Sequence, residues 1–151
     1  MPTLKDRLNA DLKTAMLARD QFTTETLRGL KAAILNEEVA TGTREQGLGD
    51  EDVEKLLMRE SKKRLEAAEL FEKGGNQASA DKERKEAELI SNYLPQQLSE
   101  GEIQKLVDEA VADIQPEGIK DMGRVIGAVK AKAGNSADGA LVARLVKEKL
   151  Q

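Results

Sequence analysis

Hydrophobic residues recur every three or four positions through most of the chain, which is the spacing of one face of an α-helix. Polar stretches rich in glycine, proline and capping residues interrupt this spacing. The pattern predicts an all-α fold with helices over about residues 3–19, 25–41, 50–73, 77–94, 100–115, 121–133 and 138–150.

The segment 93–102 divides these helices into two groups. Pro95 lacks a backbone donor and clashes with the preceding turn, at a cost of about 3 kcal/mol inside a helix, so one helix ends near Leu94. Ser99 and Glu102 have the spacing of a capping box, which starts the next helix. We therefore expect an N-terminal helical domain of about four helices (1–94), a hinge (95–99) that begins at Tyr93, Leu94 and Pro95, and a C-terminal three-helix bundle (100–151).

Several polar residues have the position of a helix cap. Thr3 and Asp6 have the spacing of an N-cap pair for the first helix. Asp50, Asp121 and Asp138 each precede a hydrophobic stripe and are expected to cap the helix that follows.

The apolar stripes predict which side chains are buried. Val39 continues the stripe of the second helix, and Phe71 continues that of the third. Tyr93 is expected to pack at the hinge with its hydroxyl at the surface. The glycine-containing segment 41–50 is expected to be a mobile surface loop.

The composition excludes several kinds of site. The chain has no cysteine and no histidine, so disulfides, thiol sites and the usual zinc spacings are absent, and we expect neither a metal nor a cofactor. There is no nucleophile elbow and no phosphate-binding glycine loop, so we expect no catalytic residue and no enzyme activity from this chain alone. No apolar run approaches the ~20 residues of a membrane span and no signal peptide is evident, which favours the cytoplasm.

Charge is distributed unevenly along the chain. The formal net charge is -4. Residues 121–150 nevertheless hold six basic residues and only three acidic ones. A positive field is therefore expected at the C-terminal end.

Gly123 and Gly127 lie four residues apart in a predicted helix and therefore on one of its faces. Each costs a helix interior about 1 kcal/mol relative to alanine, so the pair needs a reason. One reason is close packing of helices inside the bundle. The other is a groove for a polynucleotide or for the backbone of a protein partner.

The segment 135–140 joins the last two helices and brings the positive N-terminal end of the final helix near these glycines. Asp138 is better explained as the cap of that helix than as a direct ligand. The candidate nucleic-acid-binding residues are Lys120, Gly123, Arg124, Gly127, Lys130, Lys132, Asn135, Asp138, Gly139 and Arg144.

Four motifs, at 27–34, 93–99, 121–127 and 137–139, together resemble the GatB/YqeY family in its stand-alone YqeY-like form. The resemblance covers essentially the whole chain. It implies a helical N-terminal part and a three-helix C-terminal part similar to the tail of the B subunit of tRNA-dependent amidotransferases and to appendages of some glutaminyl-tRNA synthetases. Those tails help to hold tRNA, whereas the chemistry belongs to other parts of the amidotransferase.

This resemblance favours a non-catalytic tRNA-binding accessory module that recognises tRNA by shape and phosphate contacts, aided by an aminoacyl-tRNA synthetase or an amidotransferase. The three aromatic residues, Phe22, Phe71 and Tyr93, form no platform for stacking bases. Two alternatives stay open: a helical adaptor between proteins, and a component of a glutamine-dependent carbon-nitrogen ligase that needs other subunits.

Overall fold

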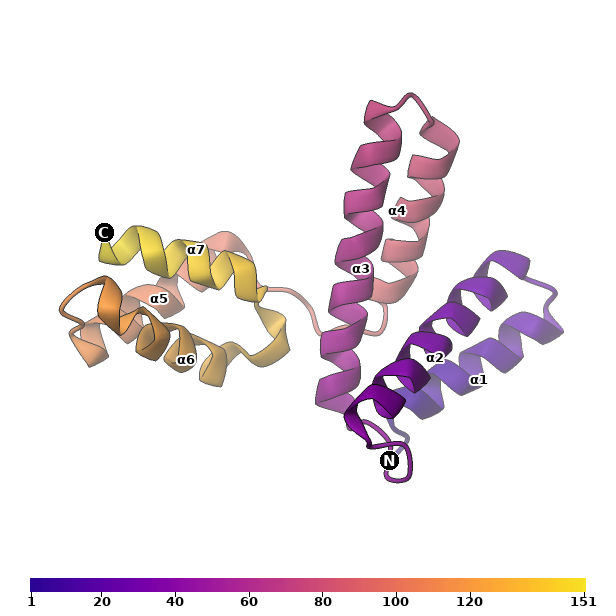
Figure 1. Cartoon of the computed structure of the whole chain (residues 1–151), viewed down its shortest axis with the longest axis horizontal. Coiled ribbons are helices and arrows are strands. Elements are labelled where there is room, and N and C mark those ends of the chain that lie inside the picture. Colours follow the sequence, from indigo (N-terminus) through magenta and orange to yellow (C-terminus); the bar gives the residue numbers. More distant parts are fainter. The chain divides into compact units, whose positions relative to one another are not determined.

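The computed structural model describes residues 1–151, which form α-helices and two short 3-10 helices and no strand (Figure 1). The all-α prediction is confirmed. The elements are α1 (Leu4–Leu17), α2 (Gln21–Thr41), α3 (Asp50–Lys73), α4 (Gln77–Ser91), α5 (Glu100–Ile114), η1 (Ile119–Asp121), α6 (Met122–Ala133), η2 (Gly134–Ser136) and α7 (Gly139–Leu150).

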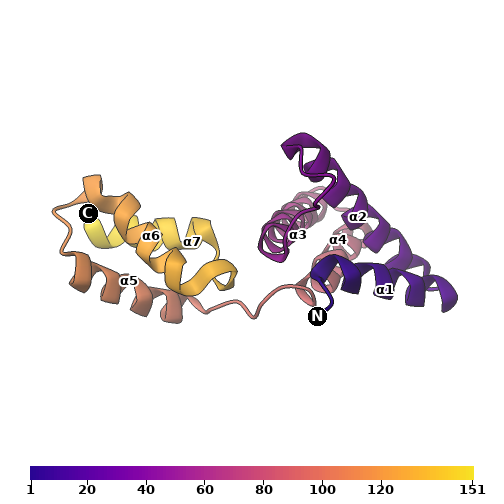
Figure 2. The same cartoon turned by 90° about the horizontal axis from the view of Figure 1, so that it is seen from below.

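The chain divides into two units, Met1–Leu94 and Pro95–Gln151, each with its own hydrophobic core. In the first unit, α1 pairs with α2 and α3 pairs with α4 as two helical hairpins, and α3 and α4 lie side by side in both views (Figure 2). In the second unit, α5, α6 and α7 form a three-helix bundle. That residues 95–99 act as a hinge between independent domains stays a prediction.

Local capping sets the starts of the first two helices. The Thr3 side chain accepts from the amide of Asp6, and the Asp6 carboxylate accepts from the amide of Thr3, so the predicted cap pair is present as a complete capping box. The Asp20 carboxylate accepts from the amide of Thr23 at 3.1 Å. Because of this cap, α2 begins at Gln21, earlier than the apolar stripe indicated.

Two predicted caps serve other parts of the chain. The Asp50 carboxylate accepts from the amide of Leu4 at 2.9 Å and so caps α1, while Gly49 occupies the N-cap position of α3 without a side-chain bond. The Asp121 carboxylate turns back to the amide of Glu117 at 2.9 Å and makes no cap bond to α6. Sequence spacing identified carboxylates that bond to backbone amides, but it assigned them to the wrong amides.

Two stripe predictions were also wrong. Val39 is 60% exposed, whereas the neighbouring Glu38 is only 4% exposed. The Glu38 carboxylate accepts from Lys5 Nζ at 2.7 Å and from the amide of Leu48 at 2.8 Å, and these bonds lower its pKa. This contact therefore stabilises the fold at neutral pH and is lost as the pH falls through the folded-state pKa of Glu38. Phe71, the other stripe residue, lies at the surface.

Glu38 also fixes the segment that joins α2 to α3. Its bond to the Leu48 amide ties the end of this loop to the last turns of α2, while the paired Lys5 comes from α1. Asp50 makes a second link between the same regions through its bond to the start of α1. The predicted loop is thus attached to the N-terminal core at its second half.

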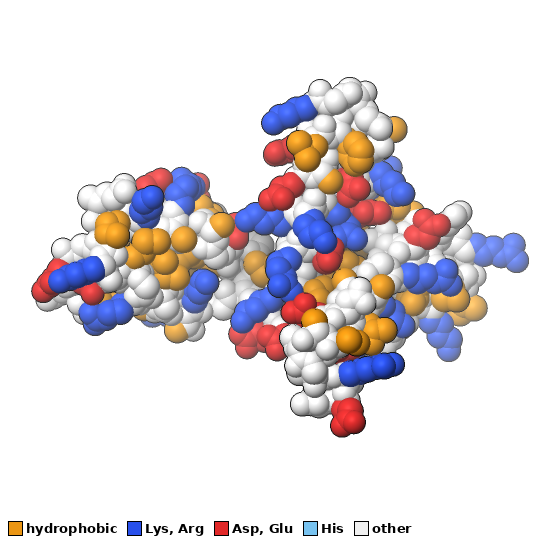
Figure 3. All heavy atoms as spheres, in the orientation of Figure 1, with side chains coloured by type: hydrophobic (Ala, Val, Ile, Leu, Met, Phe, Trp, Pro, Cys, Tyr) orange, Lys and Arg blue, Asp and Glu red, His pale blue; other side chains and the backbone are white.

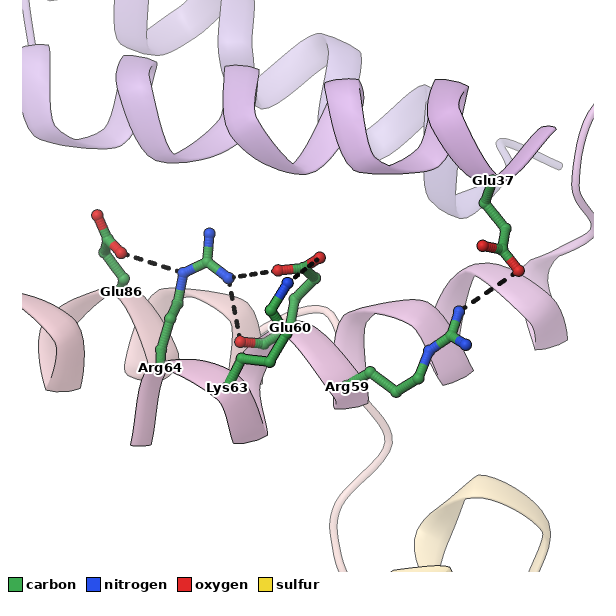
Figure 4. A network of polar contacts seen from close by, with 6 residues as sticks. All are labelled: Glu37, Arg59, Glu60, Lys63, Arg64 and Glu86. Carbon is green, nitrogen blue, oxygen red and sulfur yellow. Dashed lines mark hydrogen bonds and ion pairs between the residues drawn. The ribbon is translucent and has the colours of Figure 1, made fainter. Parts of the chain in front are cut away.

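A polar network joins α3 to its neighbours (Figure 4). Arg64 is 17% exposed and pairs with Glu60 at 2.8 Å and with Glu86 of α4 at 3.0 Å. Arg59, which is more exposed, pairs with Glu37 of α2 at 3.5 Å. The sequence had indicated pairing within α3, and the network adds contacts to both other helices.

We expect Arg64→Ala to lower the free energy of unfolding by about 2–3 kcal/mol, because it leaves two half-buried carboxylates close together without their shared cation. The matched variant Arg59→Ala removes an exposed pair and should cost at most about 1 kcal/mol. Urea unfolding followed by circular dichroism measures both. Equal costs for the two variants would contradict the assignment of Arg64 as the centre of the network.

The last residue of the first unit's core is Tyr93, which is buried. Its hydroxyl donates to the Asp11 carboxylate, so the prediction of a surface hydroxyl was wrong. The Arg7 guanidinium lies 5.1 Å from the centre of the ring and donates to the carbonyl of Asn92. Helix α4 itself ends at Ser91, and turn bonds carry the chain on to the proline.

Beyond the proline, the chain belongs to the bundle. The amide of Leu98 donates to the carbonyl of Ser136 at 2.7 Å, and the Gln97 side chain donates to the carbonyl of Asn135 at 2.9 Å. Ser99 caps α5 by accepting from the amide of Glu102 at 3.1 Å, which is half of the predicted capping box. The N-terminal half of the 95–99 segment is therefore the part without such attachments to α6 and α7.

Burial and the hydrogen bond to Asp11 raise the pKa of Tyr93 above its ordinary value. We expect no ionisation of this side chain in the folded protein between about pH 9 and 11, where an unfolded tyrosine titrates. Because the neutral form is favoured in the folded state, the stabilisation is fully present below pH ~10 and declines above it. Absorbance at the phenolate band tests this cleanly, because Tyr93 is the only tyrosine and there is no tryptophan.

The same absorbance titration in denaturant is the control and should give a midpoint near the ordinary pKa of about 10. A native titration with that same midpoint would show that the hydroxyl is open to solvent.

Candidate nucleic-acid interface

The rotation of α6 in the bundle is set by Val125 and Val129, both fully buried. A helix turns 100° per residue, so the positions two before each valine lie on the opposite side. Those positions are Gly123 and Gly127, and both are exposed. The core valines thus turn the two glycines away from the bundle.

Neither glycine is needed for helix packing. A Cβ built on Gly123 or on Gly127 meets no heavy atom within 4 Å. Close packing inside the bundle was one of the two reasons that the sequence left open, and the geometry contradicts it. Both residues instead expose helical backbone that larger side chains would cover.

A third small residue extends this surface. Ala131 follows Gly127 by four residues and is also exposed. We call the surface formed by Gly123, Gly127 and Ala131 the glycine face. Sequence reasoning missed Ala131, although the same four-residue spacing would have found it.

Two basic residues border the glycine face. Helical spacing places Arg124 on one side of it and Lys130 on the other. Arg124 lies 3.7 Å from the Asp121 carboxylate, whereas Lys130 has no ion-pair partner. The Lys130 ammonium extends toward the start of α7, where a Cβ on Gly139 would lie 3.4 Å from Nζ. The absence of a side chain at Gly139 therefore leaves room for Lys130.

The other predicted cations are paired. Lys120 pairs with Glu117 at 2.5 Å, and Lys132 pairs with Glu109 of α5 at 3.6 Å. Arg144 pairs with Glu100 of α5 at 3.0 Å and with Glu148 at 3.4 Å. Lys132 and Arg144 thus extend toward α5, so the structure does not gather all the predicted residues on one surface.

The turn before α7 is ordered by hydrogen bonds. The Asp138 carboxylate accepts from the amide of Ala140 at 3.2 Å and caps the helix, as predicted. The carbonyl of Asn135 accepts from Gln97. Asp138 places a negative charge at the helix start, so an anion there would compete with the cap.

Geometry gives this surface a binding role more readily than a chemical one. The glycine face admits close approach of another backbone, and the unpaired ammonium of Lys130 can bind an anion. No group of three or more acidic side chains lies in an arrangement that would hold a metal ion. No helix combines the length and the apolar character that crossing a bilayer requires.

Comparison with known proteins places these features in context. A family model described as "Yqey-like protein" matches residues 5–150. The chain is 27% identical over 145 residues to "Altered inheritance of mitochondria protein 41, mitochondrial" of Pyrenophora tritici-repentis, covering 94% of this chain and 78% of that protein. Its namesake in Lachancea thermotolerans is 31% identical over 110 residues, which is 72% of this chain and 58% of that protein.

A second kind of relative is much longer than this chain. A glutamyl-tRNA(Gln) amidotransferase subunit of Thermococcus sibiricus is 40% identical over 58 residues, which cover 36% of this chain and 9% of that protein. The motifs had indicated the B subunit, whereas the name of this relative carries the letter E. The chain is therefore similar to a short helical segment of an amidotransferase subunit.

The glycine face gives a prediction about stability. We expect Gly123→Ala and Gly127→Ala each to raise the free energy of unfolding by about 0.5–1 kcal/mol, because the added methyl meets no atom and the unfolded chain loses freedom. Gly29→Ala, in the middle of α2 with equally open space, should do the same. Thermal unfolding of the three variants measures the effect.

Gly42→Ala is the control with the opposite sign, because Gly42 has a φ of +69° and alanine is strained there by about 1–2 kcal/mol. Destabilisation by alanine at Gly123 or Gly127 would mean that the methyl meets an obstacle, and that the face is not open.

Proposed function

The chain belongs to the Yqey-like protein family, and on that basis we propose that it is a non-catalytic accessory module that binds tRNA through the glycine face of α6. The observation that carries the proposal is the pair of outward-facing glycines beside an unpaired lysine. Two exposed glycines weaken an isolated helix by about 2 kcal/mol in total. A helix that retains them without a packing reason is suited to a ligand that must approach its backbone.

The proposed ligand is recognised by phosphate and shape. The C-terminal unit contains no aromatic residue, so it cannot stack bases in the way that readers of single strands do. Glycine and alanine offer no side-chain group that reads a base edge. Lys130 and Arg124 on either side of the face supply charge for a ribose-phosphate backbone that passes between them.

The ion pairs around the face do not prevent this. Lys120 and Arg124 are exposed, and exposed pairs contribute only about 0–1 kcal/mol. A phosphate can therefore replace Glu117 or Asp121 as the partner at little cost. With Lys130, about three phosphates would be neutralised, which gives a slope of log K against log salt of roughly -2.7.

The similarity to part of an amidotransferase subunit supports a partner that acts on the same tRNA. We propose an aminoacyl-tRNA synthetase or an amidotransferase, whose own contacts would add to the modest affinity of this surface. The chemistry then resides in the partner. The cytoplasm remains the proposed compartment from the sequence, while two relatives of this chain carry the word mitochondrial in their names.

The test is fluorescence anisotropy of a labelled tRNA(Gln) transcript titrated with the full chain. We expect binding that weakens about 40-fold between 50 and 200 mM salt. Lys130→Glu should weaken binding at low salt by tenfold or more and reduce the salt slope by about one to two. Lys105→Glu is the matched control, because this exposed lysine of α5 also has no ion-pair partner and lies outside the face.

A steric variant separates the face from its charges. Gly127→Leu should abolish tight approach and weaken binding, whereas Gly29→Leu in the N-terminal unit should not. Absence of tRNA binding at low salt, or binding that neither Lys130→Glu nor Gly127→Leu alters, would contradict the proposal. Either result would favour the adaptor between proteins.

A further inference from the structure

A second surface lies on the α1–α2 hairpin. A pocket of about 370 Å³ opens between the two helices and is lined by apolar parts of Leu8, Ile34 and Leu35, with Asn9 and Lys31 among its other residues. Leu35 is 43% exposed, and Val39 lies one turn further along α2 and is also exposed. Hydrophobic and basic side chains alternate over this hairpin on the face drawn in Figure 3.

The acidic side chains of the hairpin are already engaged elsewhere. Glu38, at the pocket, accepts from Lys5 and the Leu48 amide, and Glu37 pairs with Arg59 of α3. The remaining acidic residues are held by Thr3, Tyr93, Thr23 and Gln21, in the order Asp6, Asp11, Asp20 and Glu25.

The basic side chains beside the pocket are less occupied. Lys31 lines the pocket and has no ion-pair partner. Arg28, one turn before it, contacts only the sulfur of Met16, at 3.9 Å, which is a weak acceptor. The charge available to a ligand along this seam is therefore positive, next to an apolar floor.

We infer that the α1–α2 seam docks an acidic amphipathic helix of a protein partner. Two antiparallel helices form a groove in which a third helix buries leucine-like residues at positions i, i+3 or i+4, and i+7. Leu35 and the pocket receive those side chains, and Lys31 and Arg28 pair with carboxylates on the flanks. The small exposed Ala32 lets the partner helix approach α2 closely.

A second copy of this chain is a poorer occupant. Its most suitable helix, α5, is acidic and amphipathic, but its apolar residues Ile103 and Val107 are buried in the core of the bundle. Docking that helix would require the bundle to open. The inference concerns the N-terminal unit and does not rest on the proposed tRNA site.

The test uses the full chain labelled with ¹⁵N and two designed helical peptides of about 18 residues, or five turns. Both have leucines at the same spacing, with glutamates on the flanks of one and lysines on the flanks of the other. We expect the glutamate peptide to bind at least tenfold more tightly and to shift the amides of Asn9, Lys31 and Leu35. Leu35→Ser and Lys31→Glu should each weaken it about tenfold.

Leu65→Ser is the matched control, because this leucine of α3 is 48% exposed but lies outside the pocket. It should leave peptide binding unchanged, and none of these variants should alter tRNA binding. Equal affinity for the two peptides, shifts outside the seam, or equal effects of Leu35→Ser and Leu65→Ser would overturn the inference. Sedimentation showing a dimer that Leu35→Ser dissociates would overturn it in favour of a second copy.

Discussion

Burial of Val125 and Val129 is the constraint on which the proposed interface depends. These two side chains fix the rotation of α6 about its axis, and the 3.6-residue repeat then decides which residues face solvent. Gly123 and Gly127 are turned outward as a consequence. The binding surface is therefore positioned by the most buried part of the bundle, and its exposed residues contribute nothing to holding the helix in place.

Charge pairing determines where this chain can attract a ligand. A third of the residues are charged, and many cations are paired on neighbouring helices, as Arg64 is with Glu86 and Lys132 with Glu109. Position along the chain is thus a poor guide to surface charge. Lys130 near the glycine face and Lys31 in the N-terminal seam differ from those cations in having no carboxylate partner.

Most of the fold was predictable because it follows from local rules. Hydrophobic periodicity located the helices, and the caps at Thr3, Ser99 and Asp138 involve residues only two or three positions away. Predictions failed where the partner is distant in sequence: Asp50 caps α1, and the Tyr93 hydroxyl binds Asp11. For the candidate site, spacing identified the glycines and Lys130, but the pairing of Arg144 with α5 depends on tertiary packing.

The central claim is that a tRNA backbone lies against the exposed backbone of α6. The most direct measurement is a ¹⁵N NMR titration of the full chain with unlabelled tRNA, because glycine amides fall in a separate region of the spectrum. We expect the amides of Gly123 and Gly127 to shift or broaden at the lowest tRNA concentrations, before those of α5. Perturbations confined to the N-terminal unit, with both glycine amides unchanged at saturation, would contradict the claim.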